Sequence, residues 1–334
     1  MKKTVFFILF LFSTTLFAQQ NTPFVKEMEV IEKVLELDRT LLITHDRTVV
    51  DSFFLSHTVY NIEMTDNDYE QLKNGCRARN LPMDFLHKIL PDYIPDPEIY
   101  IDVERSVYPV DYYVFSENQN SFDYYVVIPE KGGASSFSAY FFKGKTLIER
   151  HDIYQDEFLK IEYFKTDFGA CVIYYPQLFI SITGSFWENY FFYRYTDDNR
   201  LIPVLNELHT SHFTMPWNAK TFLYDTEITN VNPLKIAMRY ELSVTNMETR
   251  EQELWMTEST ETSYKWNDSL QQYIPDFQNK LFDRDRIASF YLFQNELLFI
   301  HCFADELKQM LLGKDPEKSR LTSSYLNKVR SRYK

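Results

Sequence analysis

The hydrophobic and polar positions between Gly184 and Asn206 alternate with a period of two, which is typical of paired β-strands. One face of the first strand is almost wholly aromatic; it carries Trp187, Asn189, Phe191, Tyr193 and Tyr195. The other face mixes aromatic with charged residues, so we expect the aromatic face to be buried in a core. The returning strand contains Pro203, which has no N–H to give to a ladder. That strand is therefore expected either to lie at a sheet edge or to bulge.

The same alternation recurs through residues 98–303, where we predict an antiparallel β-rich domain. Outside the hairpin above, the expected strands are residues 110–115, 122–128, 137–142, 146–151, 158–164, 170–175, 178–182, 222–228, 234–244, 253–257 and 261–266. Short polar turns join several of them into aromatic hairpins, a pattern compatible with a propeller-like arrangement or with a large meander. Residues 297–303 fit two templates, a strand or a buried helix.

Residues 19–97 follow a helical period instead, and we predict a small, mainly helical region there. The apolar positions of its first helix are Phe24, Met28, Ile31 and Leu35. A second helix is expected over residues 65–75, where a glycine ends it, and a third over residues 82–91. Residues 41–60 are apolar but less periodic, so we assign no element to them.

Two changes of composition mark the boundaries of the β-rich domain. Residues 91–98 contain three prolines, which cannot continue a helix. Residues 304–312 then predict a short helix that Gly313 closes, followed by a tail, residues 314–334, with seven basic and two acidic residues. The basic tail is expected to be a solvated, partly helical end lying on an acidic surface; the alternative is docking to anionic lipid or polysaccharide. The predicted fold class is α+β and mainly β, with a helical N-terminal region and a short C-terminal helix.

Residues 1–18 have the composition of a secretory signal peptide. Lys2 and Lys3 precede an apolar run, and Ala18 supplies a small residue at the expected cleavage point. The apolar run is shorter than the roughly 20 residues of a membrane-spanning helix, so an uncleaved anchor is the weaker alternative. We expect a mature chain that begins at Gln19, has no transmembrane segment and resides in the periplasm of a bacterium or outside the cell.

Acidic residues outnumber basic residues, and the formal net charge of the chain is −13. Because nucleic-acid phosphates would be repelled by such a chain, we expect no nucleic-acid partner. With 334 residues, the chain is also longer than one hydrophobic core usually supports, so two domains or subdomains are expected.

Three cysteines are too few for a disulfide scaffold and odd in number. Cys171 and Cys302 lie in apolar runs and are expected to be buried thiols, whereas Cys76, at an expected helix end, is predicted to be the most exposed. A surface thiol is the simpler interpretation of Cys76, and a nucleophile beside Arg77 and Arg79 is the alternative. The sequence does not reveal which of the three, if any, form a disulfide.

The sequence predicts no cofactor, metal-binding or catalytic residues. The chain has seven glycines, and none is placed for a dinucleotide fingerprint, a phosphate loop or a nucleophile elbow. His209 and His212 are three residues apart on an expected strand, which favours two ordinary histidines over a zinc site. The acidic run from Asp66 resembles the start of a calcium loop, but it has Gln71 and Arg77 where glycine and glutamate are needed.

These observations favour an exported, β-rich, non-enzymatic binding module with an unknown protein or glycan partner. Two alternatives remain: an extracytoplasmic, glycan-directed hydrolase that uses carboxylates, and an accessory or inhibitor subunit of another protein. Sugar-stacking platforms could come from Trp187, Trp217, Trp255 and Trp266, although core packing is the more general role of such residues. Two carboxylates about 5–10 Å apart in one groove would favour the hydrolase.

Overall fold

The computed structural model describes residues 24–38, 42, 57–94, 107–118, 120–129, 136–155, 160–180, 186–214, 220–245, 252–276 and 295–333. The expected signal peptide lies outside these ranges. Contacts divide the chain into two compact units. The larger unit comprises residues 47–242 and 256–279, and the smaller one comprises residues 1–46, 243–255 and 280–334.

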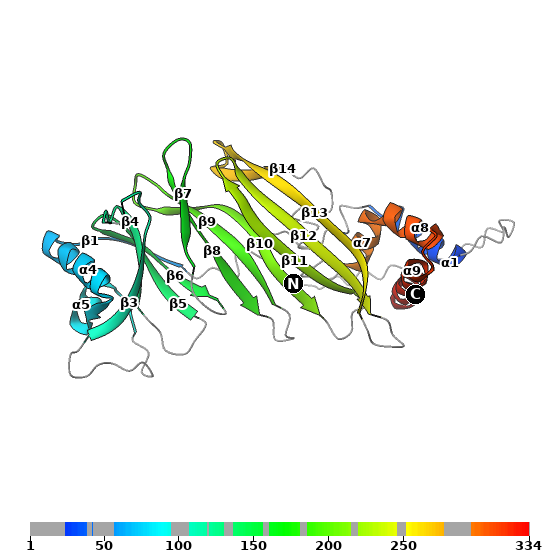
Figure 1. The fold of residues 1–334 in the computed structure, drawn as a ribbon, viewed down its shortest axis with the longest axis horizontal. Helices are drawn as coiled ribbons and strands as arrows, with labels where there is room; N and C mark the ends of the chain where they lie inside the picture. The colour runs from blue at the N-terminus through cyan, green and yellow to red at the C-terminus, as the bar shows by residue number, and fades with distance from the viewer. Residues whose placement is uncertain are drawn as a thin grey trace, which may run out of the picture. The chain divides into compact units, whose positions relative to one another are not determined.

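In the larger unit, six strands form an antiparallel sheet in the order β1-β6-β5-β4-β3-β2 (Figure 1). The strands are β1 (His57–Glu63), β2 (Asn80–Pro82), β3 (Val107–Val114), β4 (Tyr124–Pro129), β5 (Ser136–Lys143) and β6 (Thr146–Tyr154). Two helices, α4 (Asp66–Ala78) and α5 (Met83–Ile89), cover one face of this sheet. The core beneath them joins side chains of α4 and α5, such as Leu72 and Leu86, to Tyr125 and Phe142 of the sheet.

Eight further strands form a second sheet, in which the strands follow one another in chain order from β7 to β14. They are β7 (Glu162–Lys165), β8 (Cys171–Ile180), β9 (Phe186–Tyr195), β10 (Leu201–Thr214), β11 (Lys220–Val231), β12 (Leu234–Thr245), β13 (Gln252–Asn267) and β14 (Gln272–Asp276). The mainly β prediction is confirmed. The propeller-like arrangement is not confirmed, because the described strands of the larger unit form two sheets.

Two strands of the second sheet are longer than the sequence pattern indicates. The strands predicted over residues 170–175 and 178–182 meet in one strand, β8, which is described as far as Ile180 and whose ladder to β9 continues on both sides of Pro176. The described pairing of β7 with β8 runs from Cys171 to Tyr174, so Pro176 lies in a part of β8 that has β9 as its described partner, and an edge position of this kind tolerates a missing N–H donor. Residues 253–257 and 261–266 likewise belong to one strand, β13.

The aromatic hairpin predicted at residues 184–206 is the pair β9 and β10. The register shifts between Pro203 and Leu205, so the proline lies at a bulge, one of the two expected outcomes. The described pairing of β10 with β11 lies farther along the strand, from Thr210 to Thr214. Phe191, Tyr193 and Tyr195 are buried, as expected for the aromatic face. They belong to a second core, which β8, β9 and β10 share with β4, β5 and β6 of the first sheet.

The helix α4 begins where the sequence predicts but does not stop at Gly75. Its N-cap is Thr65, whose hydroxyl oxygen accepts a hydrogen bond from the Asp68 N–H at 3.2 Å. The helix continues to Ala78, and a Cβ atom at Gly75 would lie 1.9 Å from the Leu81 Cδ2 atom. The glycine therefore permits close packing of β2 on the helix. The prediction that Gly75 ends the helix is wrong, because a glycine needed for close packing looks the same in the sequence as one that ends a helix.

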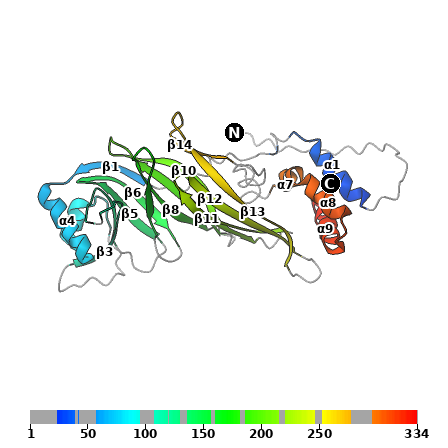
Figure 2. The ribbon, with the colours of Figure 1, turned by 45° about the horizontal axis from the view of Figure 1, so that its top comes forward.

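The smaller unit is mainly helical in its described part. It contains α1 (Val25–Leu35), α7 (Glu296–Cys302), α8 (Ala304–Leu312) and α9 (Pro316–Arg332), of which α1, α8 and α9 pack together (Figure 2). Of the two templates for residues 297–303 the helix is the one adopted, capped by Asn295, and Gly313 follows α8 as predicted. Trp255 is buried in this unit and donates a hydrogen bond to Thr322 at 3.0 Å. None of the helices in the described ranges is both long and apolar enough to cross a membrane.

Candidate functional site

A pocket of about 570 Å3 lies between β3 of the first sheet and β7 of the second sheet. Its lining is formed by Arg79, Tyr112, Tyr113, Val114, Phe115, Ile161, Glu162 and Tyr163. Ligand pockets in proteins commonly have volumes of about 300–1,000 Å3, lined by aromatic groups and a few polar ones. The pocket has this size and composition, so we treat it as the candidate site.

One wall of the pocket is an incompletely paired edge of β3. The short strand β2 pairs only with Val107, Tyr108 and Pro109 at the start of β3. The N–H of Val110 then donates to the carbonyl oxygen of Arg79 at 3.2 Å. In the described part of the chain, no strand pairs with β3 on this side beyond Val110.

Contacts between β7 and the turn after β3 hold the two sheets together beside the pocket. The hydroxyl group of Tyr163 donates to the carbonyl oxygen of Ser116 at 3.0 Å. The centroids of the Tyr163 and Phe115 rings lie 5.6 Å apart, and Lys165 Nζ lies 3.0 Å from Glu117 Oε1. These contacts connect the two walls through side chains, without a β-ladder between β3 and β7.

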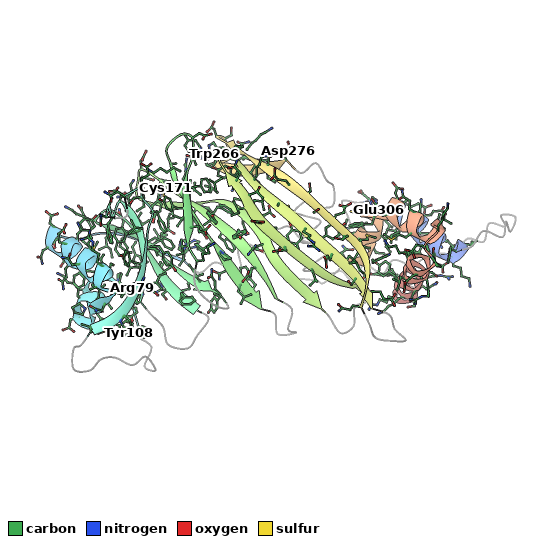
Figure 3. The ribbon with its side chains drawn as sticks, viewed as in Figure 1. Arg79, Tyr108, Cys171, Trp266, Asp276 and Glu306 are labelled. Carbon is green, nitrogen blue, oxygen red and sulfur yellow. The ribbon has the colours of Figure 1, made fainter. Side chains whose placement is uncertain are left out.

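Arg79 brings a positive charge to the pocket. It caps the C-terminus of α4 in a left-handed conformation, with φ of 55°, and lies alongside β3 (Figure 3). Its side chain is 75% exposed, and its Nη1 atom lies 3.6 Å from Asp111 Oδ1. An exposed ion pair at this distance contributes little to stability, so the guanidinium group can turn to a ligand at small cost.

Glu162 brings a negative charge and is held in its ionised form. Burial opposes ionisation of this carboxyl group, but hydrogen bonds from Lys160 and Tyr174 outweigh the burial and lower its pKa. Lys160 Nζ lies 2.5 Å from Glu162 Oε1. Glu162 is therefore a fixed acceptor at neutral pH and is poorly suited to deliver a proton.

Tyr113 keeps its proton over the same pH range. Burial raises the pKa of its phenol, and the charge of Asp111 acts in the same direction, whereas Arg79 opposes both. The neutral hydroxyl group can donate one hydrogen bond and accept others. The pocket thus offers a phenol, a guanidinium group and a carboxylate.

This arrangement does not match the requirements of glycoside hydrolysis. That reaction uses two carboxyl groups on either side of the scissile bond, one of them with a raised pKa. Among the described residues that line the pocket, Glu162 carries the single carboxylate, and its pKa is lowered. The described lining of the pocket therefore lacks the pair of carboxyl groups that this reaction uses.

A second polar cluster, Glu149–His151–Tyr175, lies buried between the two sheets. His151 Nε2 lies 3.0 Å from Glu149 Oε2, and His151 Nδ1 lies 2.7 Å from the Tyr175 hydroxyl oxygen. A carboxylate only accepts, so Nε2 carries the hydrogen of the neutral ring and Nδ1 accepts from Tyr175. The other oxygen of Glu149 accepts from the Leu201 N–H at 3.1 Å. All three side chains are nearly inaccessible to solvent, which makes this cluster a structural link between β6, β8 and β10.

The prediction that Cys76 is the most exposed cysteine is wrong. Its side chain is fully buried in the core beneath α4, and burial raises the pKa of its thiol to about 12. Cys171 is buried as predicted, with the pKa of its thiol likewise raised to about 12. The prediction of a buried Cys302 is wrong, because this cysteine, the last residue of α7, is partly exposed. All three are free thiols. A nucleophilic role for Cys76 is thereby removed.

The described side chains among the residues weighed as metal ligands have other partners. His209 stacks on Tyr190, with ring centroids 4.1 Å apart, and its Nδ1 atom lies 3.2 Å from the Thr226 hydroxyl oxygen. His212 lies in the same strand, β10, but its side chain is outside the described ones. Asp66 begins α4. The described residues contain no group of three or more His, Cys, Asp or Glu side chains able to hold a metal ion.

Neither of the two described tryptophan side chains considered as sugar platforms lines the pocket. Trp255 is a core residue, whereas Trp266 is partly exposed and packs against Arg194, with the guanidinium carbon 5.0 Å from the ring centroid. Trp217 and the side chain of Trp187 lie outside the described part of the structure.

Sequence reasoning did not single out the residues of the pocket. In the sequence, Tyr112, Tyr113 and Tyr163 fall within predicted strands like many other aromatic residues, and Arg79 stands out only as a neighbour of Cys76. The available signal was Asn80-Leu81-Pro82, three residues between two helices, which are too few to pair along the whole of β3. Arg79 and residues 112–115 come next to residues 161–163 only through the packing of the two sheets, which no local pattern predicts.

Comparisons of the chain with known protein families, with curated proteins and with solved structures found no match.

Proposed function

We propose that this chain is an exported, non-enzymatic binding module whose ligand occupies the pocket between β3 and β7. One observation carries the proposal: a pocket of about 570 Å3 presents tyrosine side chains, a guanidinium group and one ionised carboxylate. Aromatic faces supply contact area, and a few fixed polar groups orient a ligand. The ligand is a protein segment or a glycan. If it is a protein segment, this chain could serve as the accessory or inhibitor subunit of the protein that carries the segment.

A ligand screen with a matched pair of variants tests the proposal. Thermal unfolding of the chain from Gln19 is followed with a random peptide library in pools and with a panel of oligosaccharides. We expect one class to raise the Tm of the wild type and of Tyr154→Ala, which removes an exposed tyrosine outside the pocket, but not of Tyr113→Ala. Equal stabilisation of all three proteins by every hit would place the binding site elsewhere and contradict the proposal.

The hydrolase alternative predicts a different result in the same samples. Release of shorter sugars from an oligosaccharide, abolished by Glu162→Gln, would show that the pocket performs chemistry. We expect no such release, because the pKa of Glu162 is lowered and no second carboxylate lines the pocket in the described structure.

Export is supported by the basic start, the apolar run and Ala18. N-terminal sequencing of the protein from fractionated bacterial cells is expected to give a chain that begins near Gln19 in the envelope or the medium. Recovery of an intact Met1 terminus from the cytoplasm would contradict this part of the proposal.

A further inference from the structure

The outer edge of β3, with which no strand of the described structure pairs beyond Val110, directs backbone groups towards the pocket. On one side of this strand, the Phe115 N–H donates to Tyr124 of β4 at 2.8 Å; on the opposite side, the Val110 N–H donates to Arg79. Backbone groups of successive residues in an antiparallel strand point to alternate sides. Odd-numbered residues here therefore bond to β4, and the N–H and C=O groups of Tyr112 and Val114 point to the outer edge.

These outward N–H and C=O groups lie in line with the hydrogen bonds that β3 already makes to β2. β2 occupies the outer edge of β3 as far as Pro109, and the carbonyl oxygen of Arg79 takes the next N–H, that of Val110. Tyr112 and Val114 are the next two outward positions on the same line, and both line the pocket. A strand bound there would continue the sheet at the place where β2 stops.

The side chains beside this edge fit the two faces of such a strand. Tyr112 and Val114 pack on the helix-covered core, whereas Tyr113 and Phe115 pack on the core between the sheets. Successive side chains of a bound strand would point alternately to these two sides. Arg79 is the one cation among the described lining residues, so an acidic side chain is favoured at the end of the ligand near α4.

A glycan would make fewer contacts in this pocket than an extended polypeptide. Stacking needs a free aromatic face, but the Tyr112 ring is stacked on Phe122 with centroids 5.8 Å apart. The Tyr163 hydroxyl hydrogen is already donated to Ser116. The backbone groups of Tyr112 and Val114, in contrast, alternate as donors and acceptors along a strand, which is the arrangement that another polypeptide backbone complements.

We therefore propose that the ligand of the pocket is an extended polypeptide segment with an acidic residue near Arg79, and that it binds by adding a strand to β3 at Tyr112 and Val114. This inference rests on the proposed function and adds to it the class of ligand and the mode of recognition. Main-chain pairing supplies the affinity and the alternate side chains supply the selectivity.

The test uses a random dodecapeptide library displayed on phage, selected on the immobilised chain from Gln19. An enriched peptide is synthesised with each amide N–H methylated in turn, and its Kd is measured by fluorescence anisotropy. Strand addition predicts losses of about 10-fold or more at every second position, with changes below about 3-fold at the positions between them, because alternate N–H groups face β3.

Substitutions in the protein locate the ladder. Val114→Pro removes the outward N–H of β3 and is expected to abolish binding, whereas Val114→Ala keeps that N–H and is expected to retain it. Circular dichroism verifies that both variants fold. If Val114→Pro does not fold, Arg79→Glu is used in its place. The affinity of this variant for an acidic peptide is expected to fall at least about 10-fold, and it is expected to recover when the acidic residue of the peptide is changed to lysine.

The outcomes separate this inference from the proposed function. A period-two methylation pattern that depends on Val114 supports strand addition. Uniform losses, no losses, or the absence of any enriched peptide overturn it. An oligosaccharide that binds with dependence on Tyr113 while peptides fail overturns the inference and leaves the proposed function intact. Failure of both ligand classes contradicts both.

Discussion

The pocket between β3 and β7 and the buried Glu149–His151–Tyr175 cluster are built from similar chemistry. Both contain tyrosine hydroxyl groups, a carboxylate and one further nitrogen group, and both lie where the two sheets of the larger unit meet. In the buried cluster every one of these side chains bonds to another protein group and is shielded from water. In the pocket Arg79 is 75% exposed, and the outer edge of β3 beyond Val110 has no strand partner in the described structure.

The difference shows that residue type alone does not separate a buried structural cluster from an exposed candidate site. A buried polar group must have its hydrogen bonds satisfied inside the protein, because an orphan costs about 1–3 kcal/mol. Groups at the pocket can be satisfied by water until a ligand replaces it. The two regions should therefore respond differently to substitution. Changes in the Glu149–His151–Tyr175 cluster should lower the free energy of unfolding, whereas changes in the pocket should lower ligand affinity with little effect on stability.

The largest effect is expected from Phe191→Ala. Phe191 is buried in the core shared by the two sheets, so its truncation should cost roughly 3–5 kcal/mol of unfolding free energy. Thermal melting should show a decrease in Tm of roughly 10 °C, with Phe168→Ala, at a half-exposed phenylalanine, as the control. A shift of less than about a degree would move this face of β9 from the core to the candidate sites.

The next effect is expected from Glu149→Leu. This substitution leaves the Leu201 N–H and the His151 Nε2–H without their acceptor, at about 1–3 kcal/mol for each group. In the pocket, Glu162→Gln keeps an acceptor for Tyr174 and is expected to change the free energy by less than about 1 kcal/mol. Urea denaturation of the two variants measures the contrast. Equal destabilisation would remove the distinction between the two regions.

His151 should make the buried cluster sensitive to acid. Burial lowers the pKa of His151, although the Glu149 carboxylate partly opposes that shift. The unfolded chain takes up this proton near pH 6.5 while the folded chain does not, so the contribution is complete above that pH and is lost as the pH falls below it. The slope is at most about 1.4 kcal/mol per pH unit. Urea denaturation between about pH 7.5 and 5.5 is expected to show a smaller decrease for His151→Gln than for the wild type; parallel curves would contradict the assignment.

The smallest effect on stability is expected from Arg79→Ala. The Arg79–Asp111 pair is exposed, so its loss should shift Tm by less than about 2 °C. Peptide affinity, in contrast, should fall by about 10-fold if the guanidinium group meets an acidic residue of the ligand. Asp111→Ala breaks the same ion pair and serves as the control, since it leaves the cation in place. An unchanged Kd for Arg79→Ala would show that the pocket does not use this charge.

The sequence by itself determined the features that depend on local periodicity. The alternation at Phe191, Tyr193 and Tyr195 predicted a strand with a buried aromatic face, and Pro203 predicted either an edge or the bulge that is observed. Thr65 and Gly313 marked helix boundaries correctly, because caps act on the nearest turn of the backbone.

Only the tertiary structure decided which surfaces these elements share. Cys76 is buried because its side chain lies in the core between α4 and the first sheet, together with Tyr125 and Phe142 of distant strands. The buried cluster joins residues of three strands, and the pocket joins Arg79 to Tyr113 and Tyr163 across two sheets. Hydrophobic periodicity and capping residues reflect interactions within one helix or strand, so they can be recognised in the sequence. A site made from distant segments depends on how whole sheets pack to bury apolar area, and that packing involves the entire chain.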